Sequence, residues 1–235
     1  MNPFAFDHLP FDPAGPVPHA GDLPAMDGVS ADAAERLFRP RVQQMQRYRE
    51  MTIDELLLEN RVIFLVGEIH HGSAMGVVMR LLHLSNTKPG QDINLYINSP
   101  GGSVDDTLAM IDTMNFLQCD VATYCIGKAM SGGALTLAAG TKGKRYCLPH
   151  AKVMIHQPYG GIGGQASDVA IQAEEIIKTK NELNAMLSEY TGQTVEQIQE
   201  DSERDKFFNA EEAKAYGLVD EVITKPAEQP KSEMP

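Results

Sequence analysis

The 235-residue sequence contains no tryptophan and only three cysteines, Cys119, Cys125 and Cys147. These cysteines form no CxxC pair, so the sequence indicates neither a zinc ribbon nor a dithiol redox motif. All three fall in segments that are expected to be strands. We therefore expect buried free thiols rather than a disulfide, in a protein of a reducing, cytoplasmic compartment.

Positive charge and long apolar runs are also scarce. Lysine and arginine number 20 against 32 acidic side chains, which gives a net charge of -12. This charge opposes binding to nucleic acid or to an anionic membrane. No apolar run approaches the roughly 18 residues of a membrane helix, and no basic residue precedes Arg36, which argues against a secretory or transit peptide. A protein or a small molecule is the expected partner.

The chain is long enough for one sizeable core, so we expect one domain between two irregular ends. Residues 1–51 begin with a proline-rich stretch that lacks a sustained apolar period, and this is typical of a disordered leader. An arginine-rich stretch at 36–50 follows as a short helix or an ordered arm. The domain is expected to span 52–224, and residues 225–235 form a polar, flexible tail.

Strand-like and helix-like patterns alternate within the expected domain. Strands are expected at 62–67, 93–98 and 121–127 and in "KRYCLP" and "KVMIHQ", and helices at 73–87, 104–118, after Ser131 and at about 167–190. Such alternation predicts an α/β fold with a mainly parallel, buried sheet. The apolar positions of 73–87 that suit a helix are Met75, Val78, Met79, Leu82 and Leu84.

Three signals mark the ends of helices in the second half of the chain. Gly192 is expected to stop the long helix at 167–190. Thr194 in "TVEQ" and Asn209 in "NAEE" have the capping-box arrangement that begins a helix.

Ser131 stands among the smallest side chains of the chain, in "GKAMSGGALT". Ala129 and Gly133 flank it in the small-x-Ser-x-small pattern of a nucleophile elbow. The backbone N–H of Gly132, at the start of the following helix, would stabilise a developing oxyanion. A serine in such a helix is more often a packing residue, so this segment alone leaves both interpretations open.

The loop "NSPGGSV" at 98–104 follows a strand and precedes a helix. Its two glycines allow close approach of the backbone and can leave N–H groups free to meet an anion or a carbonyl oxygen. Taken alone, such a pair of glycines more often makes a plain tight turn. The loop is neither GxGxxG nor a Walker motif, so nucleotide binding has no support.

His156 and Asp205 are candidate partners for an activated serine. His156 ends the strand in "KVMIHQ", where the loops of α/β sheets carry sites. Asp205 lies in the charged run "EDSERDKFF", and the aromatic pair Phe207 and Phe208 after it predicts that the chain turns inward there, with Asp205 partly buried. The adjacent histidines at 70–71 could instead bind a metal ion, but they lack the HxxxH or HxH spacing of a zinc site.

These residues and the segments around them resemble the ClpP family, the proteolytic subunits of the ATP-dependent caseinolytic proteases. The resemblance covers about 56–223 and includes "LYINSPGGSV", "GKAMSGGAL", "GTKGKRYCLPHAKVMIHQPYGGIGGQASD", "DSERDKFF" and "AEEAKAYGLVDEVI". It implies a crotonase-like body with a projecting strand-helix handle at about 157–191. It also implies two stacked seven-membered rings and a candidate propeptide within 1–51.

The resemblance assigns roles residue by residue. It implies a catalytic triad of Ser131, His156 and Asp205, with the backbone N–H groups of Gly102 and Gly132 as oxyanion donors. The triad roles would be those of other serine peptidases, although the chain order Ser, His, Asp differs from theirs. It implies no metal and no cofactor in this chain. Unfolded proteins would be delivered by a Clp-family AAA+ ATPase that uses the ATP, and peptides would be cleaved without it.

The resemblance also points to surface positions. Docking of the ATPase falls on Tyr96 and Phe116, whereas Asn94 stands where the family often has an aromatic residue. Arg204 matches an arginine associated with contact between rings. Gly132 stands where the family commonly has methionine, and a backbone N–H at that position would keep its role.

Two other functions are compatible with parts of the pattern. An acyl-CoA enzyme of the crotonase type would also use paired glycine N–H groups, but it needs no Ser-His-Asp triad. A non-catalytic ring subunit would keep the fold and lose the triad, whereas all three triad positions are filled here.

Overall fold

The computed structural model describes residues 51–158 and 163–224, so nearly all of the expected leader and tail lies outside the described residues. The elements in this range are, in order, α2 (Ile53–Glu59), β1 (Val62–Val66), α3 (His71–Thr87), β2 (Ile93–Ser99), α4 (Val104–Phe116), β3 (Val121–Met130), α5 (Gly132–Ala138), β4 (Arg145–Cys147), β5 (Lys152–Ile155), α6 (Ala166–Thr191), α7 (Val195–Asp201), β6 (Lys206–Phe208), α8 (Ala210–Tyr216) and β7 (Glu221–Val222).

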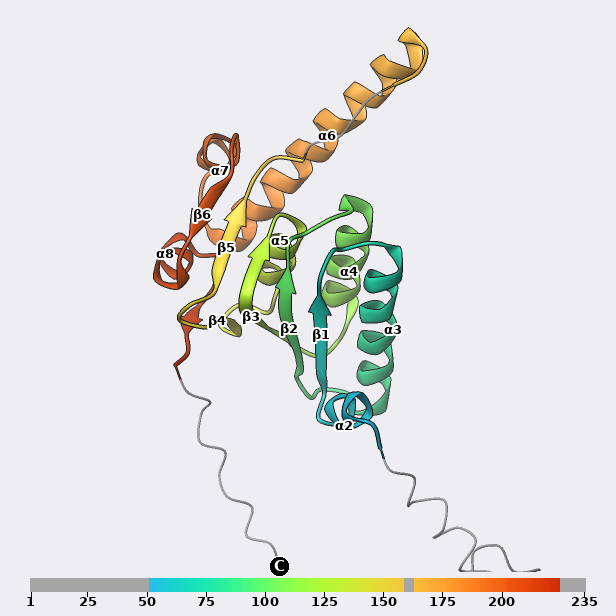
Figure 1. Ribbon diagram of the computed structural model, residues 1–235, viewed down its shortest axis with the longest axis vertical. Coiled ribbons are helices and arrows are strands. Elements are labelled where there is room, and N and C mark those ends of the chain that lie inside the picture. The colour runs from blue at the N-terminus through green and yellow to red at the C-terminus, as the bar shows by residue number, and fades with distance from the viewer. Residues whose placement is uncertain (1–50, 159–162, 225–235) are drawn as a thin grey trace, which may run out of the picture. The chain divides into compact units, whose positions relative to one another are not determined.

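The strands form one mixed sheet in which the order β1-β2-β3-β4-β7 is parallel throughout. β5 also pairs with β3 in parallel, and β6 pairs with β5 in the antiparallel sense. The predicted α/β fold with a mainly parallel sheet is confirmed (Figure 1).

β3 is three residues longer than the sequence pattern predicted, and its two halves have different neighbours. Residues 123–125 pair with β4, whereas residues 128–130 pair with β5. Gly127, with a φ of 80°, lies between the halves. A glycine inside a strand often marks a bend, and here it separates two parts of the sheet that share one strand. The second half ends directly before Ser131.

The core lies between the sheet and helices α3, α4 and α5, which pack on one of its faces (Figure 1). β2 alternates strictly, so that Ile93, Leu95 and Ile97 are fully buried while the residues between them are only half-buried. This alternation is what one covered face and one more open face require.

The predicted helix at 73–87 is confirmed as α3, but its buried face is not made of the apolar positions that indicated it, apart from Leu84. The buried residues are Ala74, Val77, Leu81 and Leu84, whereas the side chain of Met79 is 65% exposed. Apolar side chains occur on both sides of this helix, so their periodicity does not identify the buried face.

α6 ends at Gly192 as predicted, because this glycine adopts the left-handed conformation with a φ of 78°. The C-terminal half of the helix packs on the body through the buried Leu187, while its N-terminal half extends away from the sheet and exposes Ile171 and Ile177 (Figure 1). The handle strand is not seen in the described residues, since 157–158 and 163–165 are not in a strand and 159–162 lie outside the described range.

Both predicted helix starts after α6 are confirmed. Thr194 is the N-cap of α7 and accepts a hydrogen bond from the N–H of Gln197. Asn209 is the N-cap of α8 and forms a complete capping box with Glu212.

The three cysteines are buried and free, as predicted, although Cys119 precedes β3 rather than lying within it. In the part of the chain that the structure describes, no helix has the length and apolar character needed to cross a membrane.

Candidate active site

Ser131 occupies a sharp turn between β3 and α5. Its φ of 53° and ψ of -122° are unusual for a residue with a side chain, and among the described residues other than glycine only Arg61 also has a positive φ. The turn is fixed by the Ser131 N–H, which donates to the carbonyl of Met154 at 2.8 Å, and by the Ser131 carbonyl, which accepts from Ala134 at 2.9 Å. Such a strained strand-to-helix turn is the geometry of a nucleophile elbow.

His156 and Asp205 are brought together by the antiparallel pairing of β5 and β6. Ile155, the last residue of β5, is the partner of Lys206, the first residue of β6, so the residues just outside this pair face each other. His156 Nδ1 lies 3.0 Å from Asp205 Oδ1. Two residues that are far apart in the sequence thus form one hydrogen-bonded pair.

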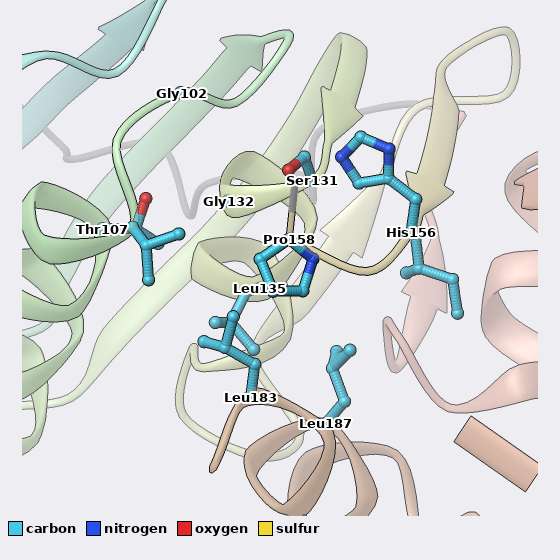
Figure 2. Close-up of a pocket in the computed structure, with 11 residues that line it drawn as sticks. Gly102, Thr107, Ser131, Gly132, Leu135, His156, Pro158, Leu183 and Leu187 are labelled. Atoms are coloured by element: carbon cyan, nitrogen blue, oxygen red, sulfur yellow. The ribbon is translucent and has the colours of Figure 1, made fainter. Parts of the chain in front are cut away.

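Ser131 lies near His156 because β3 and β5 are parallel neighbours whose carboxyl ends are close together. Ser131 and His156 line the same cavity, together with Gly102 and Gly132. In Figure 2 the imidazole ring of His156 lies beside the Ser131 hydroxyl.

The prediction that Asp205 is partly buried is wrong for the described chain, since its side chain is 56% exposed, against 15% for His156. The predicted inward turn is made by Phe208 alone, because adjacent residues of β6 point to opposite faces and leave Phe207 exposed.

The glycine loop before α4 approaches the backbone after β1 very closely. The Ile69 N–H donates to the Gly101 carbonyl and the Ser103 N–H donates to the Ile69 carbonyl, both at 2.8 Å. Gly102 lies between them, and a Cβ there would stand 2.1 Å from the Ile69 carbonyl oxygen. Among the described residues its N–H has no hydrogen-bond partner.

Gly132 is the first residue of α5 and lies next to Ser131. A Cβ at this position would stand 2.4 Å from Thr107 Oγ1, so the space is already filled. The Gly132 N–H, like that of Gly102, has no partner within the described part of the chain. Two unpaired N–H groups beside a serine on a strained turn are suited to hold an oxyanion.

The cavity beside Ser131 has a volume of about 40 Å³ and mostly apolar walls. Helix α6 contributes Leu183 and Leu187 to it, opposite the glycine loop (Figure 2). A wider cleft of about 450 Å³ shares Ser131 and His156 with the cavity and is bordered by Glu68 and Pro100. The cleft and the cavity therefore meet at Ser131 and His156.

The adjacent histidines 70 and 71 have structural contacts. His70 caps α3 by accepting a hydrogen bond from the Gly72 N–H, and His71 Nδ1 lies 3.3 Å from Asp106 Oδ1. Among the described residues, no group of three or more His, Cys, Asp and Glu side chains is arranged to hold a metal ion.

Comparison with known proteins decides the family. A family model for Clp protease matches residues 44–226. The chain belongs to the Clp protease family. It is 49% identical over 215 residues to the ATP-dependent Clp protease proteolytic subunit 1 of Rhodopirellula baltica, across 91% of this chain and 94% of that protein. The function of this Clp protease chain is therefore that of a proteolytic core subunit, and its class is serine peptidase.

Tyr96 and Phe116, the expected docking residues of this Clp protease chain, lie in different settings. Phe116 ends α4 with its side chain 80% exposed. Tyr96 stacks between Phe64 and Tyr124, with ring centroids 5.4 and 4.5 Å apart, and Tyr124 stacks on Tyr146 at 4.9 Å. These four rings, called the aromatic row below, cross β1 to β4. Sequence reasoning missed three of them, although each stands next to a buried position of its strand.

Asn94, the departure noted at the docking surface, is tied to this aromatic row. Its Oδ1 accepts a hydrogen bond of 3.1 Å from the hydroxyl of Tyr124. Burial, with the neighbouring Tyr96 and Tyr146, raises the pKa of Tyr124 to about 12, so its phenol stays a proton donor at neutral pH.

Arg204 directly precedes Asp205 and is exposed. Within the described residues it makes no ion pair or hydrogen bond, and its guanidinium is thus available at the surface of the chain.

Proposed function

We propose that Ser131, His156 and Asp205 act as a catalytic triad that cleaves peptide bonds. The observation that carries the proposal is the 3.0 Å contact between His156 Nδ1 and Asp205 Oδ1, beside a serine on a strained turn that shares a cavity with the histidine. A serine becomes a nucleophile only when a positioned base takes its proton and a third group orients that base.

In the proposed reaction, the Ser131 oxygen attacks the scissile carbonyl carbon while His156 takes the serine proton. Asp205 holds the imidazole with its proton on Nδ1, so Nε2 is the nitrogen that accepts. His156 then gives the proton to the leaving amine, and an acyl-enzyme on Ser131 remains. Water, activated by the same imidazole, hydrolyses the ester and restores the serine.

We propose Gly102 and Gly132 as the oxyanion donors. Both N–H groups lack partners among the described residues, and both glycines border the cavity with Ser131. Close contacts exclude a side chain at either position, which supports a role for the backbone alone. One such donor is worth about 3 to 4 kcal/mol in a transition state.

We propose that this chemistry needs no metal or cofactor and that the chain acts in the cytoplasm. The triad supplies base, nucleophile and orienting group from its own side chains. The buried free thiols fit a reducing compartment.

We propose that the chain assembles as two stacked heptameric rings and receives unfolded proteins from a Clp-family AAA+ ATPase. Family membership suggests oligomers and such ATPases as partners. Apolar side chains exposed on α3 and on the N-terminal half of α6 support association of subunits. Phe116 and the aromatic row are the proposed ATPase-docking surface, and Arg204 is proposed for contact between rings.

A fluorophosphonate probe tests the triad directly. The wild-type chain should be labelled on Ser131, while the Ser131→Ala chain should take up no label, and a chelator should change neither result. Native mass measurement of the same samples tests the double ring. Labelling that persists in Ser131→Ala would overturn the assignment of the nucleophile, and a native mass that is not fourteen subunits would overturn the proposed rings.

A further inference from the structure

Thr107 of α4 is a buried residue that neither the triad nor the oxyanion donors account for. Its side chain is 1% exposed, and its hydroxyl donates to the Ser103 carbonyl at 2.7 Å. It lines the cavity beside Ser131, across from α6 (Figure 2). The hydrogen bond fixes the rotamer, so the side chain is a rigid part of the cavity wall.

Thr107 also accounts for the absence of a side chain at Gly132. A Cβ on Gly132 would stand 2.4 Å from Thr107 Oγ1 and 3.2 Å from Thr107 Cγ2. Positions 107 and 132 therefore compete for one volume next to the nucleophile, and in this chain Thr107 occupies it.

The space that remains is small. The cavity of about 40 Å³ is well below the roughly 150 Å³ that holds a benzene molecule. Apart from Ser131, His156 and Thr107, the lining side chains that face it are apolar, including Val104, Leu135 and Leu183. A charged side chain would lose its hydration here, and a large apolar one would not fit.

We infer that Thr107 sets the size limit for the side chain that precedes the scissile bond, so that the protein cleaves after residues of alanine to valine size in preference to leucine or phenylalanine. The inference rests on the proposed function, because it takes the cavity to be the pocket for that side chain. Thr107 acts by volume, while the reaction itself is carried out by Ser131 and His156.

Peptide hydrolysis by the full-length chain tests the size limit. Four fluorogenic peptides that differ only in Ala, Val, Leu or Phe before the scissile bond would be compared by kcat/KM. Wild type should favour Ala and Val over Phe by about tenfold or more, which is what one or two surplus methylenes change in an apolar pocket. Thr107→Ala should lower the ratio of kcat/KM for the Ala and Val peptides to that for the Phe peptide by about tenfold.

Two further variants separate volume from the hydroxyl group and from misfolding. Thr107→Val keeps the volume and removes the hydroxyl, so its ratio should match that of wild type. Thr107→Ser keeps the hydrogen bond to Ser103 and removes one methyl group, so it should move the ratio in the direction of Thr107→Ala. The Ser variant keeps the test valid if Thr107→Ala does not fold.

The competition between positions 107 and 132 provides a readout that does not depend on peptide sequence. Gly132→Ala should slow labelling of Ser131 by a small fluorophosphonate, and Thr107→Gly combined with Gly132→Ala should recover much of the lost rate. Additive effects of the two substitutions would contradict a shared volume.

The outcomes distinguish this inference from the proposed function. A labelled wild-type protein that cleaves after Phe as well as after Ala overturns the size limit alone. Unchanged ratios in both Thr107→Ala and Thr107→Ser, or a ratio in Thr107→Val that moves as far as in Thr107→Ala, also overturn it. If wild type is neither labelled nor active on any peptide, the proposed function fails and the inference falls with it.

Discussion

At the scale of single residues, Ser131 combines two demands that conflict. Its backbone conformation favours glycine, while the proposed chemistry needs a hydroxyl on a β-carbon. A residue with a side chain in such a conformation carries about 1–3 kcal/mol of strain. The backbone strain at the proposed nucleophile thus lowers the stability of the folded protein.

We therefore expect the free energy of unfolding of Ser131→Gly to exceed that of Ser131→Ala by about 1 kcal/mol. This value is what remains of the relieved strain after the greater entropy of glycine in the unfolded chain is subtracted. Both variants lack the nucleophile, so they differ mainly in the strain at position 131. Thermal or urea unfolding of the two proteins measures the difference. A Ser131→Gly protein that is less stable than Ser131→Ala would show that the turn is not strained.

Asp205→Asn should leave the fold intact and lower turnover on the order of 10⁴-fold, because an amide would favour the wrong tautomer of His156. The exposed position of Asp205 makes a large loss of stability unexpected. Peptide hydrolysis and the melting temperature should be measured together. Glu203→Gln is the matched control, since this nearby acid pairs only loosely with Lys180 at 3.6 Å and should be replaceable without loss of rate.

At the scale of elements, one ion pair joins Arg145 of β4 to Asp220, the residue directly before the edge strand β7. Arg145 is 4% exposed and donates from Nε and Nη2 to the two carboxylate oxygens of Asp220, at 2.9 and 2.6 Å. The same guanidinium donates to the carbonyls of Ala138 and Tyr190. Three segments of the chain therefore depend on one buried charge.

Asp220→Asn should destabilise the protein by about 3–5 kcal/mol, because it leaves the Arg145 charge buried without its partner. Burial alone would raise the pKa of Asp220, but hydrogen bonds from Arg145 and from the Gly143 N–H hold that pKa below its usual value. The stabilisation is thus present above the pKa of the unfolded carboxyl and is lost as the pH falls through the lower, folded value.

Urea unfolding at neutral pH and at pH 3 measures both effects. The difference in the free energy of unfolding between wild type and Asp220→Asn should be large at neutral pH and smaller at pH 3. Glu175→Gln, which removes an exposed partner of Lys178 at 3.7 Å, should change stability by less than about 1 kcal/mol. A difference that is the same at both pH values would contradict a charged Asp220 in the folded state.

The sequence predicted most of the helices and strands, but it did not predict α2, β6 and β7, nor all of the packing. β2 could be predicted because buried and half-buried residues alternate along it. Gly192 marked the end of α6 through its left-handed conformation, and Asn209 marked the start of α8 through its capping box. The buried face of α3 could not be read from the pattern, because Met79 and other apolar side chains continue around the helix. Local periodicity cannot distinguish a face that packs on the core from one left for another contact.

The candidate site was predictable as a set of residues and not as an arrangement. Ser131, His156 and Asp205 were named from motifs, yet their proximity depends on the pairing of β3, β5 and β6, which is a long-range property. The exclusion between Thr107 and Gly132 has no local signal either, since it arises where α4 meets α5.

At the scale of the whole molecule, the proposed triad accounts for the cutting of peptide bonds and not for the unfolding of a substrate. Unfolding a domain requires about 5–15 kcal/mol, and the proposed triad supplies none of it. Short peptides avoid this requirement. The proposed ATPase partner must provide the energy, and a docking surface on this chain must hold that partner.

Phe116→Ala and Tyr96→Ala should therefore weaken ATP-dependent degradation of a folded substrate while peptide hydrolysis is largely kept. Aromatic side chains are frequent anchors of protein interfaces, and the exposure of Phe116 means that its loss should not disturb the core. Degradation with a cognate Clp ATPase and hydrolysis of a short peptide should be measured on the same assembled protein. Normal degradation by both variants would place the docking surface elsewhere, beginning with the altered position Asn94.

The left-handed turn at Ser131 also has an evolutionary consequence. If Ser131 is the nucleophile as proposed, selection for cleavage must keep a hydroxyl where the backbone favours glycine. In a duplicated gene whose product only builds the assembly, that selection is gone and the stability advantage remains. Among descendants that have lost catalysis, substitution at this codon should be biased toward glycine, and one mutational step leads there from AGC or AGT.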